Sequence, residues 1–328
     1  MFCIFQSEDI IYQDYNMKNI LVTGGTGFIG SNIVNRLVNS GYNVSVLDNN
    51  QRGFSSRLRE NIKKIKIYNG DIRDKKIVSE ACKNIHTVIH LAYVNGTKFF
   101  YQKPDLILDI AIRGMLNISD VCKEKKVKDF ILFSSSEVYS NPNVIPTSEN
   151  TSLIIPDINN PRYSYGGGKI CCELILKNMF KNYFRRAIII RPHNVYGPDM
   201  GNEHFFPEII KKLKLLRNNR QLVIQGSGNE TRAFVHINDF LDGFELVLKK
   251  GKKNEIYNIG TESEYKIIEV IRKIKKILGK KNKVIPGEIR KGSPLRRCPS
   301  IKKIRKLGYE PKISIEKGLI DVCNWYFK

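Results

Sequence analysis

Short apolar runs recur along the first 190 residues of the chain, and most of them end at glycine or at polar residues. Runs of this length, rich in Ile, Val and Leu, are typical of parallel strands buried on both faces. Segments with apolar residues at helical spacing lie between them, most clearly over residues 104–125 and after residue 162. The predicted strands are residues 18–23, 43–47, 64–68, 87–91, 129–133 and 186–190. This alternation predicts an α/β fold with a doubly wound parallel sheet.

The pattern becomes less regular after residue 190. Helices are expected over about 206–218, 239–249 and 266–278, and short strands over 221–224, 232–237 and 255–259. We expect the strand near 255–260 to return to the first sheet, and most of residues 191–328 to form a smaller C-terminal α/β domain. The main domain is assigned to residues 17–190. Residues 1–16 are interpreted as an extension, with Met17 as an alternative start, because the first well-formed element begins at Lys18.

The composition is that of a globular protein, with 41% hydrophobic and 27% charged residues. No window reaches the ~18 continuous apolar residues of a membrane-spanning helix, so no membrane association is expected. The seven cysteines are scattered and include no CxxC pair. This argues against a disulfide framework and a zinc site, and it favours a reducing cytoplasm. Lysines behind the net charge of +23 alternate with Ile and Leu at helical spacing. They are interpreted as solvated helix faces, so no nucleic-acid partner is expected.

The first predicted strand runs directly into a glycine-rich turn and a helix. Gly24, Gly27 and Gly30 have the spacing that allows a tight turn, close approach of a pyrophosphate and close helix packing. The helix that follows offers free N–H groups and the positive end of its dipole to a phosphate. Asp48 ends the second strand, where a carboxylate binds the adenosine ribose and repels a 2′-phosphate. The sequence therefore predicts a dinucleotide site that prefers NAD over NADP, with Arg52 close by as the feature that weakens this preference.

A second constellation lies in the helix predicted after residue 162. Tyr165 and Lys169 are four residues apart, so they share one helix face. A cation beside a phenol favours the phenolate, which is a competent general base. Residues 166–168, which separate the two, are all glycine. Because glycine destabilises a helix interior, this run predicts that another group approaches the backbone closely.

Polar side chains also follow the strand predicted over residues 129–133. Ser134, Ser135, Ser136 and Glu137 come directly after it. Ligands of open α/β sheets bind at the carboxyl ends of the strands, so these hydroxyls and this carboxylate are candidate site residues. A serine-rich turn without a ligand is the alternative.

A series of motifs follows one another from residue 17 to the end: T-G-G-T-G-F-I-G-S, D-N, G-D-I-R-D, H-L-A, S-S-S-E-V-Y, Y-G-G-G-K, R-P-H-N-V-Y-G-P, T-R-A-F-V-H-I-N-D and Y-N-I-G. In this order they resemble the extended short-chain dehydrogenase/reductase family, the NAD-dependent nucleotide-sugar epimerases, dehydratases and decarboxylases. The resemblance implies a Rossmann fold whose main domain binds NAD and whose C-terminal domain mainly binds the nucleotide sugar.

The resemblance also implies roles for individual residues. Tyr165 would remove the proton from a sugar hydroxyl, usually at C4, while a hydride passes to NAD. Lys169 would lower the pKa of Tyr165, and Ser135 would bind the reacting oxygen, with Glu137 as a further catalytic candidate. The cofactor-binding residues would be Gly24, Gly27, Phe28, Ile29, Gly30, Asp48, Asn49, Asp71, Ile72, Leu91, Ala92, Tyr165, Lys169 and Pro192. The substrate-binding residues would be Ser136, His193, Asn194, Arg232 and Arg297, with a packing role as the alternative for His193. Relatives usually carry Ser or Ala at the place of Gly168, which is a departure in this chain.

Three reactions share this apparatus: epimerisation, 4,6-dehydration and decarboxylation. Simple 4-epimerases of the family mostly carry small residues where this chain has Ser136 and Glu137, whereas uronate decarboxylases and GDP-mannose-type dehydratases resemble it there. Arg297 and the residues after it resemble a decarboxylase motif, but residues 141–160 and 199–204 depart from the decarboxylase pattern. We favour epimerisation, for example of the UDP-sugar 4-epimerase type. The alternatives are UDP-uronate decarboxylation, GDP- or dTDP-sugar 4,6-dehydration and, more remotely, a non-catalytic NAD-binding sensor or scaffold. The resemblance also implies a homodimer formed through the helices after Pro104 and Tyr163.

Overall fold

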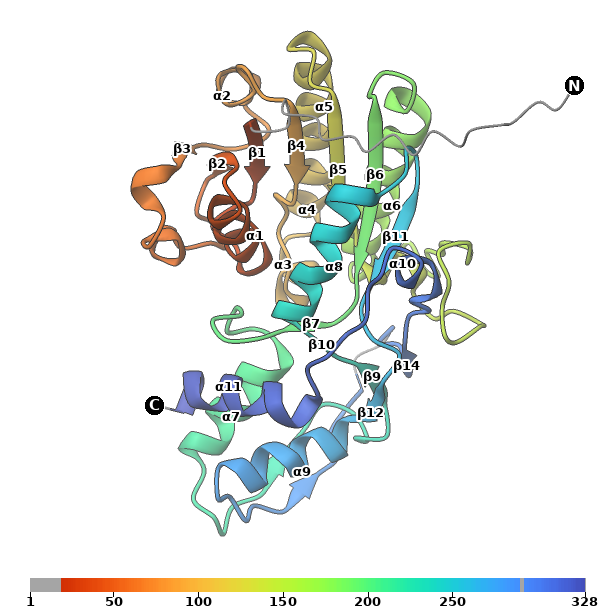
Figure 1. The fold of residues 1–328 in the computed structure, drawn as a ribbon. Coiled ribbons are helices and arrows are strands. Elements are labelled where there is room, and N and C mark those ends of the chain that lie inside the picture. Colours follow the sequence, from red (N-terminus) through yellow and green to blue (C-terminus); the bar gives the residue numbers. More distant parts are fainter. Residues whose placement is uncertain (1–18, 290–291, 328) are drawn as a thin grey trace, which may run out of the picture.

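A parallel sheet forms the centre of the computed structural model, which describes residues 19–289 and 292–327. Its strands are β1 (Asn19–Thr23), β2 (Asn43–Asp48), β3 (Lys66–Asn69), β4 (Thr87–His90), β5 (Asp129–Phe133), β6 (Arg186–Pro192) and β11 (Ile256–Ile259). They are ordered β11-β6-β5-β4-β1-β2-β3, and every neighbouring pair is parallel (Figure 1). Every residue of β4 and β5 is buried, as the continuous apolar runs predicted. The predicted α/β fold with a doubly wound parallel sheet is confirmed.

Helices cover both faces of this sheet. One face packs against α1 (Phe28–Asn39) and α8 (Ile237–Lys250). The other face packs against α2 (Lys75–Ala81), α4 (Pro104–Asp109), α5 (Met115–Glu124) and α6 (Tyr163–Ile175). The short helix α3 (Thr97–Gln102) precedes α4. Because β11 follows α8 and lies beside β6, the chain returns to the sheet after entering the second domain.

The helix expected over residues 104–125 contains an irregular turn. Between α4 and α5, residues Ile110–Gly114 form a π-helical turn. A Cβ on Gly114 would lie 2.4 Å from Cδ1 of Ile72, so glycine is required for the close contact between this helix and the segment after β3. A second π-helical turn, Leu176–Phe180, follows α6.

A smaller domain with its own apolar core follows β6. The core is formed largely by α7 (Phe205–Leu215), α9 (Ile267–Ile277) and α11 (Ile315–Phe327), which lie in the lower half of Figure 1. Short strands complete the domain: β7 (Val195–Tyr196) pairs with β10 (Val235–His236), β8 (Leu222–Val223) with β13 (Val284–Ile285), and β9 (Thr231–Ala233) with β12 (Glu264–Lys266) and β14 (Arg296–Arg297). The helix α10 (Lys302–Arg305) packs back against β11. The strand expected over residues 232–237 is therefore divided between two sheets.

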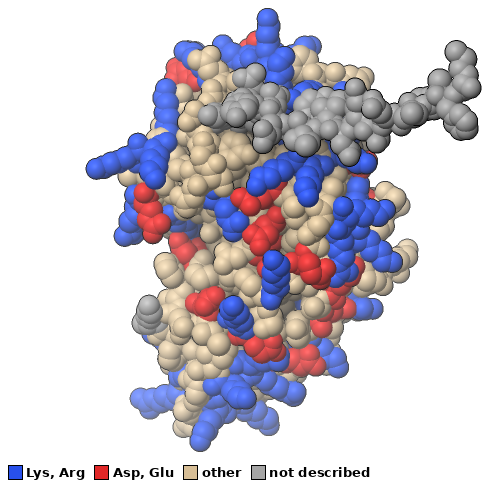
Figure 2. All heavy atoms as spheres, viewed as in Figure 1, with Lys and Arg blue, Asp and Glu red and all other residues tan. Residues whose placement is uncertain are grey.

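Figure 2 shows Lys and Arg side chains spread over the visible face from end to end, with acidic side chains among them. The six cysteines within the described ranges are free thiols, and those ranges hold no His, Cys, Asp and Glu cluster suited to a metal ion. None of the described helices is both long and apolar enough to cross a membrane.

Candidate active site

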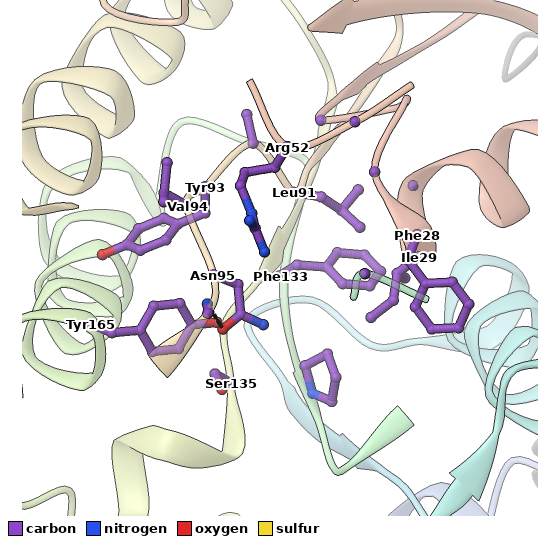
Figure 3. A pocket seen from close by; sticks show the side chains of 18 of the residues that line it. Phe28, Ile29, Arg52, Leu91, Tyr93, Val94, Asn95, Phe133, Ser135 and Tyr165 are labelled. Carbon is purple, nitrogen blue, oxygen red and sulfur yellow. Dashed lines mark hydrogen bonds between the residues drawn. The ribbon is translucent and has the colours of Figure 1, made fainter. Parts of the chain in front are cut away.

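A cleft of about 390 Å³ opens between the carboxyl ends of the parallel strands and the C-terminal domain. Nineteen of the site residues expected from the sequence line it: Gly24, Gly27, Phe28, Ile29, Gly30, Asp48, Asn49, Asp71, Ile72, Leu91, Ala92, Ser135, Ser136, Glu137, Tyr165, Lys169, Pro192, Asn194 and Arg297. In Figure 3, Tyr93 and Tyr165 lie on one side of this cleft, with Phe28 and Ile29 on the opposite side. Residues separated by more than 250 positions thus meet in one site.

The turn between β1 and α1 can be built only from glycine at two positions. Gly24 has a positive φ of 74°, and a Cβ there would lie 2.7 Å from the backbone nitrogen of Ala92. A Cβ on Gly30 would lie 2.1 Å from the carbonyl oxygen of Gly24. Gly27 precedes α1, and no side chain caps the N–H groups of the first turn of this helix. These free donors at a positive helix end suit a pyrophosphate.

Two carboxylates stand at the next two strand ends. Asp48, at the end of β2, accepts hydrogen bonds from the backbone N–H groups of Thr26 and Asn50, both at 2.9 Å. Asp71, after β3, accepts from Asn49 at 3.1 Å and from the guanidinium of Arg73. The hydrogen bond from Arg73 lowers the pKa of Asp71, so this carboxylate stays ionised. A carboxylate at the end of β2 favours an unphosphorylated adenosine ribose.

The guanidinium of Arg52 does not pair with Asp48. It lies 2.9 Å from Oε2 of Glu203 and 4.6 Å from the ring centre of Phe99. From the sequence, Arg52 was expected only to weaken the preference for NAD. In the structure its guanidinium forms an ion pair with Glu203 across the cleft. A second arginine of the same loop, Arg57, binds Asp199 at 2.8 Å, so two ion pairs join this loop to the C-terminal domain.

The phenol of Tyr165 projects from α6 into the cleft beside Ser135. Burial raises the pKa of this phenol, and the hydrogen bond with Ser135 acts in the opposite direction. The ring of Tyr165 stacks on Phe100 with centroids 4.7 Å apart. Ser135 is itself oriented by the backbone, because its hydroxyl oxygen accepts from the N–H of Glu137 at 3.2 Å. The pair is therefore held on both sides before any substrate binds.

Lys169 follows one turn later on the same helix and is 4% exposed. Its ammonium donates to the carbonyl oxygen of Phe133 at 2.7 Å and lies 4.0 Å from the ring centre of Tyr93. Burial lowers the pKa of Lys169 to about 8. The side chain is thus confined to the cleft by one hydrogen bond and one aromatic face.

The three glycines between Tyr165 and Lys169 are explained by contacts with the protein itself. A Cβ on Gly166 would lie 3.1 Å from the carbonyl oxygen of Glu137, and one on Gly167 would lie 3.2 Å from Cδ1 of Ile155. On Gly168 it would lie 2.2 Å from the hydroxyl oxygen of Tyr93. The sequence predicted a close approach to this backbone, and the approaching groups are three other segments of the chain.

Glu137 lies among arginines at the inner end of the cleft. Its Oε1 accepts from Arg297 at 2.9 Å, and its Oε2 lies 3.6 Å from Nη2 of Arg162. Burial alone would raise the pKa of Glu137, but the charges of these two arginines lower it below its usual value. Arg232 lies nearby but does not line the cleft, because its guanidinium is bound to the backbone oxygens of Thr231, Pro294 and Leu295. Burial lowers the pKa of Arg232 to about 10, and the charge of Arg297 acts in the same direction.

Sequence reasoning missed Arg162, Tyr93 and Glu203. Arg162 precedes the first residue of α6 and reaches Glu137 from there; its place three residues before Tyr165 was the available signal. Tyr93 directly follows the H-L-A motif, and Glu203 lies in a segment noted only for its departure from a pattern. Each owes its place in the site to a partner distant in sequence.

His193 is placed away from the cleft. It is 1% exposed, and its Nε2 lies 3.1 Å from Oδ1 of Asn258. Burial lowers the pKa of His193 to about 3, so the imidazole is neutral. The geometry fits the packing role that was the alternative for this residue, and it offers no contact through which His193 would bind a substrate.

Comparison with known proteins places this geometry in a family. The model of the NAD dependent epimerase/dehydratase family matches residues 20–260. The chain belongs to this family.

Its relatives within the family catalyse different reactions. The chain is 34% identical over 309 residues to a putative UDP-glucose 4-epimerase of Methanocaldococcus jannaschii, a match that covers 93% of this chain and 97% of the relative. It is 28% identical to a UDP-N-acetyl-alpha-D-glucosaminuronate decarboxylase of Bacillus cytotoxicus, covering 94% and 98% of the two chains. The solved dTDP-glucose 4,6-dehydratase of Streptomyces venezuelae, with NAD and TYD bound, superposes with a TM-score of 0.85 at 28% identity, covering 94% of this chain and 96% of that one.

Membership makes the chain an NAD-dependent enzyme of nucleotide-sugar chemistry, and the cleft fits the cofactor. The glycine turn leaves room for a pyrophosphate above free N–H donors, and Asp48 stands where the adenosine ribose would lie. When bound, NAD supplies the hydride acceptor. Tyr165, Lys169 and Ser135 line the same cleft as the glycine turn, which is the requirement for oxidising a sugar beside the cofactor.

Proposed function

We propose that this enzyme is a nucleotide-sugar 4-epimerase, which oxidises the C4 hydroxyl of its substrate transiently and reduces the resulting ketone from the other face. The observation that carries this proposal is that Tyr165, Ser135 and Lys169 line the same cleft as the glycine turn. The relative from Methanocaldococcus jannaschii, a putative UDP-glucose 4-epimerase, supports the same choice.

Each proton in this reaction has a residue to hold it. The Tyr165 phenolate accepts the proton of the sugar hydroxyl as the hydride leaves C4, and the phenol returns the proton when the ketone is reduced. Ser135 donates a hydrogen bond to the reacting oxygen and so stabilises the charge that develops on it. The Lys169 ammonium stabilises the phenolate electrostatically.

The surroundings of Glu137 favour epimerisation over dehydration. Loss of water requires a base that removes a proton from the carbon next to the ketone and an acid that protonates the departing hydroxyl. Arg297 and Arg162 favour the anion of Glu137, which makes Glu137 unsuited to the role of the acid. The neighbouring position, where a second carboxyl group would help, is occupied by Ser136. Epimerisation requires no acid or base other than Tyr165. Of the three reactions it therefore needs the fewest catalytic residues.

Decarboxylation of a uronate is the second candidate. Arg297 lines the cleft beside Glu137, and Arg162 and Arg232 lie close to the same carboxylate, which leaves a local excess of positive charge. A substrate carboxylate is a suitable counter-charge for that excess. The Bacillus cytotoxicus relative, a glucosaminuronate decarboxylase, supports this alternative.

A panel of UDP-, GDP-, CDP- and dTDP-sugars and uronates, followed by proton NMR and mass spectrometry, separates the candidates. The proposal predicts a product of unchanged mass with an altered coupling at H4. A product lighter by carbon dioxide would show that the enzyme is a decarboxylase, and a product lighter by water would show that it is a dehydratase. If no sugar reacts and the purified protein carries no NAD(H), the enzyme is not of this type.

We also propose that the enzyme is a homodimer that pairs through α4 and α6. Large apolar side chains remain exposed on these helices and on the π-helical turns that follow them: Leu108, Ile112, Leu174 and Met179. Burying such side chains is the usual driving force for association. Light scattering should then give about twice the chain mass of 37.8 kDa, and replacing Leu174 and Met179 with Glu should give the monomer. A monomeric wild-type protein would contradict this.

A further inference from the structure

The ring of Tyr93 contacts both Tyr165 and Lys169. Among the described residues, no other aromatic ring contacts both of these side chains. It follows β4 directly and lines the cleft. Its ring meets that of Tyr165 edge to face, with centroids 5.2 Å apart and planes at 88° (Figure 3). The ammonium of Lys169 lies 4.0 Å from the centre of the same ring. Phe100 also contacts the ring of Tyr165 and stacks on it.

The hydroxyl of Tyr93 explains why position 168 is glycine. This oxygen is buried and has no hydrogen-bond partner among the described residues. It occupies the space where a side chain on Gly168 would begin, since a Cβ there would lie 2.2 Å from it and 2.9 Å from Cβ of Ala111. Tyrosine at 93 and a side chain at 168 therefore exclude each other.

We propose that Tyr93 is a positioning residue for the Tyr165 and Lys169 pair, and that Gly168 is the substitution that makes room for it. The inference rests on the proposed function, in which Tyr165 is the base, and adds a residue through which that base is held. The Tyr93 ring replaces part of the hydration that the buried Lys169 ammonium has lost, because the face of an aromatic ring attracts a cation. It also limits the rotation of the Tyr165 ring.

The charge of Lys169 links this packing to the reaction. Because burial lowers the pKa of Lys169, removing the Tyr93 ring would lower it further. A less firmly charged Lys169 stabilises the Tyr165 phenolate less, so the pKa of Tyr165 would rise. The other groups facing these two side chains are His90 from β4, Ser135 and Glu137 after β5, Cys172 and Glu173 from α6, and Arg297 from β14. Each of these residues is kept in the variants at position 93, and Cys172 also faces Tyr93.

The first test compares Tyr93→Phe with Tyr93→Leu in pH–rate profiles of the sugar reaction. Phenylalanine keeps the aromatic face, so the limb that rises with pH should stay in place. Leucine removes the face, and the limb should move to higher pH by about 0.5–1 unit. Equal limbs in all three proteins, or equal shifts in both variants, would overturn the proposed role of the ring.

The second test needs no catalysis and uses a double-mutant cycle on thermal unfolding. Gly168→Ala should lower the melting temperature of the wild type by roughly 2–6 °C through overpacking against Tyr93, although alanine is otherwise the better helix former. In the Tyr93→Phe background the loss should shrink by at least half. Gly167→Ala is the matched control, because its Cβ would meet Ile155 and not Tyr93. The same loss for Gly168→Ala in both backgrounds would refute the pairing of positions 93 and 168.

Tyr165→Phe separates a failure of this inference from a failure of the proposed function. If Tyr165→Phe leaves the sugar reaction intact, the base is misassigned and both fall. If Tyr165→Phe abolishes the reaction while the Tyr93 variants show neither effect, the proposed function stands and only the role of Tyr93 is wrong.

Discussion

Nη1 of Arg297 donates a hydrogen bond of 2.9 Å to Oε1 of Glu137. This contact joins β14 of the C-terminal domain to the turn after β5, which also carries Ser135. The two side chains are 12% and 24% exposed, so their attraction is less screened by solvent than that of a surface pair. One ion pair therefore connects the domain that would bind the sugar nucleotide to the residue that would bind the reacting oxygen.

Glu137→Gln tests whether this carboxylate has a chemical or a supporting role. If the enzyme is a 4-epimerase, kcat should stay within about five-fold of wild type, because Tyr165 alone handles the proton. The free energy of unfolding should fall by about 1–3 kcal/mol, since Arg297 and Arg162 lose the charge between them. Steady-state kinetics and urea unfolding measure the two effects. Glu124→Gln, which breaks an exposed pair with Lys75, is the control and should change neither.

A different outcome would reassign Glu137. If the variant stays folded but its activity falls more than about 100-fold, Glu137 acts as an acid or base. The reaction would then be sought among decarboxylation and dehydration.

Ser135→Ala removes the hydrogen bond that opposes the effect of burial on Tyr165. The pKa of Tyr165 should rise, so the limb of the pH–rate profile that increases with pH should move to higher pH. The reacting oxygen also loses a donor, and kcat should fall by about 100-fold or more. Ser135→Thr keeps the hydroxyl and serves as the control. An Ala variant with an unshifted limb would show that Ser135 does not set the pKa of the base.

His193 should make the protein less stable in mild acid. Its pKa in the folded protein is lowered to about 3 by burial, whereas an unfolded histidine takes up a proton below about pH 6.5. The unfolded state therefore binds more protons between these values, and stability falls as the pH drops through this window. Between pH 7.5 and 5 this residue should cost about 2 kcal/mol, and His193→Gln should lose that much less over the same range. Urea unfolding at the two pH values measures this loss of stability in each protein. Equal losses in the wild type and in His193→Gln would contradict the lowered pKa of His193.

Local pattern was sufficient to predict the sheet and the glycine turn that lines one side of the cleft. Buried parallel strands are continuous apolar runs, which can be recognised in the sequence. The glycine turn requires residues without a side chain, and the spacing of Gly24, Gly27 and Gly30 shows where they are. The fold was predictable for the same reason. Boundaries were less so: β3 begins two residues later than expected, and the strand expected over 232–237 is split.

Contacts between distant segments could not be predicted in this way. Nothing near Gly168 in the sequence indicates that Tyr93, 75 residues earlier, fills its space. Arg52 likewise pairs with Glu203, which is 151 residues later in the sequence and belongs to the other domain. His193 sits next to a cleft residue in sequence, yet the strand direction turns it toward Asn258. These are results of tertiary packing, which a single sequence does not reveal without relatives or coordinates.

The central claim is that a hydride leaves C4 of the sugar and returns to the same carbon. The direct measurement is the fate of deuterium placed at C4 of the sugar nucleotide that the panel identifies as substrate, with the reaction run in ordinary water. The account predicts that the epimer keeps all of its deuterium at C4, as read by NMR and mass spectrometry, because the hydride never exchanges with solvent. Replacement of that deuterium by solvent hydrogen would show that C4 is deprotonated instead, and it would contradict the role given to Tyr165 and to NAD.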